Sequence, residues 1–199
     1  MRRTGCSVLM LLALSACMSG PPVRSVALAG GAVVAQAPDG YCVDPTASRP
    51  GDGFAIMAPC ATLGHAEAPP PLVGVATVQV GDANSRAVTG AEQDWRRMLE
   101  SDSGAALLSK NGQGDTVTVL GAQAQPNNVK VYFADTAPRP MPNVQAQEWR
   151  AFLDLNGRLV TVGVRGLASA PLTDGTGGWL LDMMVKGLVD MAAPPGPEA

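Results

Sequence analysis

The chain has 199 residues, with 14 Lys and Arg against 17 Asp and Glu, which gives a net charge of −3. A mildly acidic chain without a basic run is a poor match for nucleic acid or anionic lipid headgroups, so we expect no nucleic-acid partner. The length suits one domain, and a hydrophobic content of 46% is ordinary for a globular protein.

The amino terminus has the features of a secretion signal. Arg2 and Arg3 precede an apolar run over residues 8–14, and small residues follow that run. The run is much shorter than the roughly 20 residues of a membrane-spanning helix. Residues 14–17, Leu-Ser-Ala-Cys, resemble the lipobox of bacterial lipoproteins. The resemblance implies cleavage before Cys17, diacylglycerol on its sulfur and acylation of the new amino terminus.

This signal sets the expected organisation of the chain. Residues 1–16 are a lipoprotein signal peptide, 17–25 a lipidated tether, 26–192 a single domain and 193–199 a disordered tail. Buried acyl chains, at about 0.8 kcal/mol per methylene, would hold the protein on a membrane in the cell envelope, facing the periplasm. In the sorting systems that this signal resembles, Asp after the cysteine favours the inner membrane. Met18 stands there, so we favour the outer membrane. The alternative is a free periplasmic protein.

The cysteines predict one disulfide. Cys6 leaves with the signal and Cys17 carries lipid, so Cys42 and Cys60 remain. Two leftover cysteines in an oxidising compartment favour a structural bond between them. The competing interpretation is a redox or metal site, but Cys-x-x-Cys spacing is absent and the chain has a single histidine.

Extended segments dominate the first part of the domain. Residues 26–37, rich in Ala and Val, predict a first strand, and the segments 41–44, 54–57 and 73–80 predict three more. Two short helices should follow, one after a cap at Thr89 and one capped by Asp102 or Ser103.

The second part combines hairpins with a terminal helix. Residues 116–120 and 129–133 predict a strand pair around a turn. Asn156-Gly157 between apolar runs predicts a hairpin, because both turn positions need positive φ. The segment from Trp149 to Leu155 runs into this turn. Ala151 to Leu155 could be the end of a helix that starts near Gln145, and we favour a short helix that enters the hairpin. Apolar residues from Leu180 to Val189 recur at helical spacing, which indicates an amphipathic helix.

These elements predict an α+β fold, in which a mostly antiparallel sheet carries helices on one face and the C-terminal helix covers it. Their order resembles the fold shared by the photosystem II extrinsic protein PsbP and the Ran-binding Mog1 proteins. Residues 38–44 and 153–161 resemble uncharacterised secreted proteins of marine alphaproteobacteria, a family that implies no activity.

No catalytic signature is present, and we predict neither a cofactor nor a metal site. With His65 as the one histidine, a multi-His metal site is excluded, and we do not expect a His-based triad at this loop position. Asp39, Asp44 and Asp52 could bind calcium or act as acid and base, but their spacing matches no calcium loop and Asp is common in turns.

Other candidates also have structural interpretations. The glycine-rich residues 173–178 could hold a phosphate at a helix start, but the P-loop lysine is missing and a capped turn is favoured. A Ser–Lys dyad using Lys110 or Lys130 stays open without support. The chain has three tryptophans, Trp95, Trp149 and Trp179. We expect at least two of them to lie in the core.

The sequence therefore favours a membrane-anchored envelope lipoprotein that acts as a non-enzymatic accessory or protein-interaction module, with an envelope protein as possible partner. The alternative is a periplasmic binding module for a small hydrophobic or lipidic ligand, held between the terminal helix and the sheet by Met183, Met184 and Met191. An enzyme of unrecognised type, using Asp39, Asp44 or Asp154, ranks last.

Overall fold

The computed structural model describes residues 20–138 and 143–192, with side chains up to Val189. The signal peptide, Cys17 and the tail at 193–199 lie outside the described residues.

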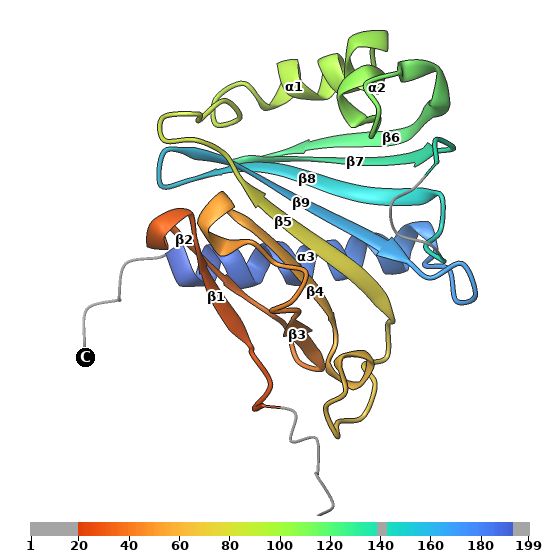
Figure 1. The fold of residues 1–199 in the computed structure, drawn as a ribbon. Helices are drawn as coiled ribbons and strands as arrows, with labels where there is room; N and C mark the ends of the chain where they lie inside the picture. Colours follow the sequence, from red (N-terminus) through yellow and green to blue (C-terminus); the bar gives the residue numbers. More distant parts are fainter. Residues whose placement is uncertain (1–19, 139–142, 193–199) are drawn as a thin grey trace, which may run out of the picture.

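Two antiparallel sheets form the framework (Figure 1). β1 pairs with β2, and the other strands form a seven-stranded antiparallel sheet in the order β3-β4-β5-β9-β8-β7-β6. The strands are β1 (Ser25–Leu28), β2 (Val33–Gln36), β3 (Tyr41–Val43), β4 (Phe54–Pro59), β5 (Gly74–Val80), β6 (Val117–Gln125), β7 (Asn128–Asp135), β8 (Gln147–Leu155) and β9 (Arg158–Gly166). The segment 26–37 thus contains two strands in place of the single one expected.

The expected α+β class, the mostly antiparallel sheet and the C-terminal helix are all confirmed. The α-helices of the described residues are α1 (Glu92–Leu99), α2 (Asp102–Leu108) and α3 (Asp174–Ala192). They do not share one face, however. α3 packs against β2, β8 and β9, whereas α1 and α2 pack over β6 and β7 (Figure 1).

The reason for two helical layers is the alternation of side chains along β8. Ala151 and Leu153 belong to the apolar cluster beneath α3, and Phe152 between them belongs to the cluster beneath α1. Consecutive strand residues point to opposite faces, so a strand with apolar residues at consecutive positions needs cover on both sides.

α3 closes tightly onto its face of the sheet. Its inward side chains are at most 2% exposed; they are Leu180, Leu181, Met184 and Leu188. A Cβ at Gly187 would lie 2.3 Å from the carbonyl oxygen of Gln36, so glycine allows the close approach of α3 to β2.

The segment before the Asn156-Gly157 turn is a strand, in contrast to the short helix that we expected. β8 pairs with β7 on one side and with β9 on the other. Asn156 and Gly157 have φ values of 49° and 75°, as the hairpin prediction requires. Pairing on both sides satisfies the backbone of β8 along its length and outweighs local helical preference.

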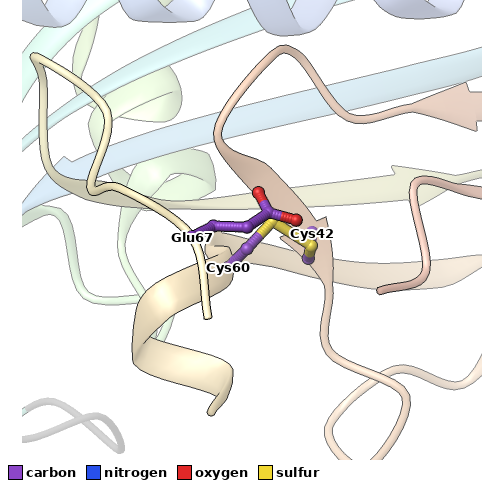
Figure 2. Close-up of side chains that lie close together, drawn as sticks. All are labelled: Cys42, Cys60 and Glu67. Atoms are coloured by element: carbon purple, nitrogen blue, oxygen red, sulfur yellow. A yellow bond between two sulfur atoms is a disulfide. The ribbon is translucent and has the colours of Figure 1, made fainter. Parts of the chain in front are cut away.

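The β3 edge of the large sheet is fastened by a covalent bond, which Figure 2 shows, and by an ion pair. Cys42 in β3 and Cys60 after β4 form the expected disulfide, with Cα atoms 4.9 Å apart. Arg24, which we expected in the tether, already contacts the domain. Its Nη2 lies 2.7 Å from a carboxylate oxygen of Glu67, and its Nη1 donates to the Tyr41 carbonyl.

Replacing both Cys42 and Cys60 by Ala should lower the free energy of unfolding by about 3 kcal/mol, because the disulfide closes a loop of 18 residues in the unfolded chain. Alanine avoids burying an unpaired hydroxyl at two fully buried positions. Urea unfolding of the variant, beside the oxidised and the reduced wild-type protein, measures the loss. Equal midpoints for all three samples would contradict a stabilising role for the bond.

Candidate functional site

A cavity of about 220 Å³ with charged groups in its lining lies on the sheet face that carries α1 and α2, beside the end of α2. Strands β5, β8 and β9 form its floor. Its lining consists of Val75, Thr77, Gln79, Lys110, Val144, Glu148, Arg150, Thr161, Gly163 and Arg165. It is the part of this face where charged and hydroxyl side chains replace the apolar cluster.

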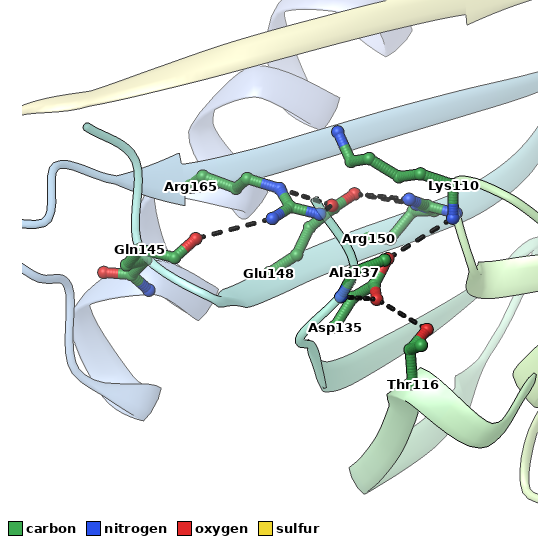
Figure 3. A network of polar contacts seen from close by, with 8 residues as sticks. All are labelled: Lys110, Thr116, Asp135, Ala137, Gln145, Glu148, Arg150 and Arg165. Atoms are coloured by element: carbon green, nitrogen blue, oxygen red, sulfur yellow. Dashed lines mark hydrogen bonds and ion pairs between the residues drawn. The ribbon is translucent and has the colours of Figure 1, made fainter. Parts of the chain in front are cut away.

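Glu148 is the centre of this cavity, and two arginines hold its carboxylate (Figure 3). Arg150 donates from Nε to Oε1 at 2.8 Å, and Arg165 donates from Nε to Oε2 at 2.6 Å. The second terminal nitrogen of each guanidinium also forms an ion pair with the same oxygen. The side chains of Glu148 and Arg165 are 5% and 7% exposed, so this cluster lies largely out of water.

Register explains why these side chains meet. Arg150 lies opposite Gly163 across the β8–β9 pair, and Glu148 and Arg165 lie next along the same face. A Cβ at Gly163 would come within 2.8 Å of Oε1 of Glu148 and 3.0 Å of the Thr77 hydroxyl. Glycine therefore leaves room for the carboxylate to lie flat against the sheet.

Lys110 adds a third cation at the mouth of the cavity (Figure 3). Desolvation lowers the pKa of Lys110, and the nearby guanidiniums of Arg165 and Arg150 lower it further, whereas Glu148 and Asp135 act in the opposite direction. Much of the lysine side chain stays accessible to solvent. The shift therefore reflects the crowding of like charge around a partly desolvated ammonium.

Asp135 holds in place the segment that carries Lys110 at the mouth of the cavity. It is fully buried and accepts hydrogen bonds from the Thr116 hydroxyl, the Ala137 N–H and the Lys110 N–H. Burial raises the pKa of Asp135, but these hydrogen bonds and the field of Arg165 outweigh it and leave the pKa lowered. Asp135 thereby ties the chain after α2 to the end of β7.

The carboxylate closest to the disulfide does not form a metal site. The sulfurs of Cys42 and Cys60 lie within 4.8 Å of a Glu67 oxygen (Figure 2). Disulfide sulfurs carry no thiolate charge, and the Glu67 carboxylate is already paired with Arg24. These residues form a structural staple.

The other polar residues singled out in the sequence are not brought together. His65 lies in the loop after the disulfide, its backbone N–H bonded to the Cys60 carbonyl. Asp44 accepts from the N–H groups of Thr46 and Ala47, which is the turn role that Asp favours. Asp52 lies 3.6 Å from Arg49 at the surface.

The glycine-rich segment at 173–178 is a helix start. The N–H of Thr176 donates to the Thr173 hydroxyl at 3.3 Å, a capping arrangement at the beginning of α3. For the Ser–Lys idea, Ser109 bonds to Asn111 and Lys130 forms an ion pair with Asp182, so neither lysine faces a serine in a described contact.

Two tryptophans contribute to the cores, as expected. Trp149 is 8% exposed and stacks on Tyr132, and Trp95 packs on Phe152 with ring centroids 5.2 Å apart. Trp179 is 52% exposed on α3.

Part of the interface between α3 and the sheet is tightly packed: Met184 is 2% exposed there, and Met183 is partly exposed. The side chain of Met191 lies outside the described ones. A hollow of about 390 Å³ lies beside the start of α3, with Trp149, Trp179 and Asp182 in its lining. The alternative hypothesis of a hydrophobic or lipidic ligand between α3 and the sheet stays a prediction.

Sequence analysis missed Glu148, Arg150 and Arg165. A signal was present, because Glu148 and Arg150 alternate with the apolar residues Trp149 and Ala151. Interpreting the segment from near Gln145 to Leu155 as a helix concealed that alternation.

No helix in the described ranges is long and apolar enough to cross a membrane. No protein-family model matches the chain. No curated protein matches it in sequence. Among solved structures, a mutant of the protein Mog1 is similar with a TM-score of 0.48 at 15% identity, over 82% of this chain and 93% of that chain.

The cyanobacterial PsbP (CyanoP) from Synechocystis sp. PCC 6803 is similar with a TM-score of 0.44 at 13% identity, over 87% of this chain and 96% of that chain. Both belong to the fold that the element order suggested. The likeness is faint, and at these scores it carries no argument about function.

Asp154 fastens β8 to the loop that leads into α1. Its carboxylate accepts from the N–H groups of Ala87, Val88 and Thr89 at 3.0, 2.8 and 2.7 Å. Burial raises the pKa of Asp154, but these three hydrogen bonds outweigh it and leave the pKa lowered. The carboxylate acts as a structural acceptor.

Asp154→Asn should cost about 2 kcal/mol of stability at pH 7, because an amide cannot replace both charged acceptor oxygens. The folded-state pKa lies below the ordinary value of about 3.9, so the contribution is present above that pH and is lost as pH falls through the folded-state pKa.

Urea unfolding at pH 7, 5 and 3 measures the difference between the two proteins. It should stay constant from pH 7 to 5 and shrink towards pH 3. Asp115→Asn, at an exposed carboxylate, is the control and should change little at any pH. A difference that did not vary with pH would contradict the role of the charge.

Proposed function

We propose that the chain is a membrane-anchored envelope lipoprotein and acts as a non-enzymatic accessory module that binds a protein partner along β6. The observation that carries this proposal is the open outer side of β6. The lipobox residues 14–17 supply the anchor, and the domain supplies the surface.

β6 is a nine-residue strand at the end of the large sheet, and within the described part of the chain no strand pairs with its outer side. It contains neither a charged residue nor a proline, two of the means by which proteins protect a sheet edge, although it does have a bulge between Val119 and Gly121. Leu120 in this strand and Leu107 in α2, which packs on β6, are each 51% exposed. An edge of this kind can accept an added strand, with the leucines providing side-chain contacts.

The opposite edge of the sheet shows the contrast. β3 has three residues, is held by the Cys42–Cys60 bond and lies against β1. A short and covered edge of this kind offers little backbone for pairing. The β3 edge of the sheet is therefore protected from strand addition, whereas the β6 edge is open.

The first described residues lie on the side of the domain away from β6, which would leave β6 accessible to a partner in an anchored protein. The described residues begin at Gly20, just before β1, which lies beside β3 and β4. The sheet order puts β6 six strand spacings from β3, or about 29 Å at about 4.8 Å per spacing. An anchor at Cys17 would thus leave the β6 edge far from the point of attachment (Figure 1).

An extended segment of another envelope protein suits this edge better than a second copy of the chain. The register of β6 shifts between Val119 and Gly121, which is a bulge near the centre of the strand. In a twofold antiparallel pair of β6 strands the two centres would face each other, so both bulges would fall where the pairing must be most regular.

A non-enzymatic role is consistent with the state of two carboxylates. Asp135 and Asp154 accept several hydrogen bonds each, and the pKa of each is lowered. Carboxylates stabilised in their charged form are poor proton acceptors at neutral pH.

Cys17→Ser should release the protein from membranes, because a lipobox at residues 14–17 attaches the acyl chains at Cys17. Fractionation of cells that express the wild type or the variant tests this. Full retention of the variant on membranes would reject the anchor and leave the β6 proposal intact.

A photo-crosslinking residue at position 120 should capture an envelope protein in intact cells, and Leu120→Lys should weaken that association by about tenfold or more, since an edge lysine opposes strand addition. The same two changes at Thr46, an exposed residue next to β3, serve as the control and should have no effect. Capture of a second copy of this chain, or equal capture from both positions, would reject the proposed partner.

A further inference from the structure

We propose that the cavity around Glu148 binds a small oxyanion, a molecule bearing a carboxylate or a phosphate group. The cavity is lined by Lys110, Arg150 and Arg165 against a single carboxylate, that of Glu148. This inference rests on the described residues alone and requires neither the anchor nor the β6 partner.

The lining of the cavity carries more positive than negative charge. Glu148 neutralises one of its two arginines, so one guanidinium charge remains uncompensated inside the cavity. Lys110 adds another at the mouth. Asp135 does not line the cavity and accepts hydrogen bonds from Thr116 and from backbone N–H groups, but its charge acts on Lys110 and Arg165 and offsets part of the excess (Figure 3). A concave site with surplus positive charge and restricted solvent attracts anions.

The cavity also contains hydrogen-bond donors that have no acceptor among the described residues. Each nitrogen of the Arg165 guanidinium already contacts an oxygen: Nε and Nη2 contact Glu148, and Nη1 donates to the Gln145 carbonyl at 3.4 Å. Arg150 uses Nε and Nη2 on Glu148 and packs its guanidinium over the Phe133 ring, 4.9 Å from the centroid. Among the described residues, Nη1 of Arg150 and Nζ of Lys110 have no hydrogen-bond partner.

These two groups are well suited to one anion. Glu148 and Phe133 fix the plane of the Arg150 guanidinium, so little side-chain entropy would be lost when it binds a ligand. The Lys110 side chain is exposed at the mouth, and its flexible stem would let the ammonium contact the anion from the solvent side. A fixed guanidinium with an adjustable ammonium is a common arrangement for carboxylate and phosphate recognition.

The uncharged part of the lining includes two hydroxyl side chains. Thr77 and Thr161 place hydroxyl groups beside Gly163, where the missing side chain keeps the floor open. Hydroxyl groups donate to anions at little cost, and they can also contact a polar group on the rest of the ligand.

Size restricts the ligand further. Cavities for drug-sized ligands occupy about 300–1,000 Å³, and this one has about 220 Å³. At about 30 Å³ per water in the liquid, that space matches about seven waters, enough for phosphate or a short dicarboxylate. The charged groups of the lining disfavour a long acyl chain, although Val75 and Val144 also line the cavity.

The state of Lys110 agrees with an anion site. Its pKa is lowered by desolvation and by the two arginines, which means that the empty cavity disfavours the ammonium charge. An anion between Lys110 and Arg150 would relieve that repulsion and be held by both.

The test uses the full chain purified in nonionic detergent and titrated with inorganic phosphate, succinate or chloride at constant ionic strength. Isothermal titration calorimetry gives the affinity, and the rise of the unfolding temperature gives an independent measure. We expect phosphate or succinate to bind and chloride not to bind. The stronger of the two identifies the source of the oxyanion.

Three variants locate the site. Lys110→Gln should weaken binding by about tenfold or more, as expected for loss of a charge-assisted hydrogen bond. Lys186→Gln removes the same charge from the exposed side of α3, on the opposite face, and should leave the affinity unchanged. Thr161→Val changes no charge and should weaken binding by a smaller factor.

Equal losses in the Lys110 and Lys186 variants, or equal binding of chloride, would overturn the proposal, because either result shows only diffuse attraction to positive charge. Absence of heat and of thermal stabilisation with both oxyanions at millimolar concentration would overturn it as well. Lys110 and Lys186 both lie at the surface, so neither variant should unfold the protein, and the unfolding temperature without ligand verifies this.

Discussion

Successive side chains of β8 point to opposite faces of the sheet, and both apolar cores of the protein are built on that alternation. Ala151 and Leu153 lie beneath α3, and Phe152 lies beneath α1. Because β8 has paired strands on both sides, its backbone is fully satisfied and its position is fixed. Each helical layer thus packs against a strand that the other layer also holds in place.

The charged cavity occupies the part of the α1–α2 face that the second core does not cover. Over β6 and β7, apolar residues such as Val131 meet the helices, whereas further along β8 the same face carries Glu148 and Arg150. Ionic groups at a largely buried position contribute little net stability compared with apolar packing. Their presence where an apolar residue would pack is the reason to regard this region as a site and not as unfinished core.

Much of the fold was predictable because its signals are local. The Asn156-Gly157 turn, the β-branched strands and the heptad-like spacing in α3 each depend on a few neighbouring residues. The strand identity of β8 depends on β7 and β9, which lie elsewhere in the chain, and local pattern favoured a helix. Because β8 was predicted as a helix, the site was not predicted, since Glu148 and Arg150 lie on one face only in a strand. The second helical layer was missed for the same reason, because it needs Phe152 to face away from α3.

The disulfide Cys42–Cys60 has a mechanical consequence. If the chain is anchored as proposed, any pull between membrane and partner enters the domain through β1 and leaves through β6. At the entry point Arg24 is paired with Glu67, Val23 accepts the N–H of Val43, and a covalent bond joins β3 to the end of β4. Load is therefore passed into the sheet at a place where the neighbouring strands cannot be peeled apart one hydrogen bond at a time.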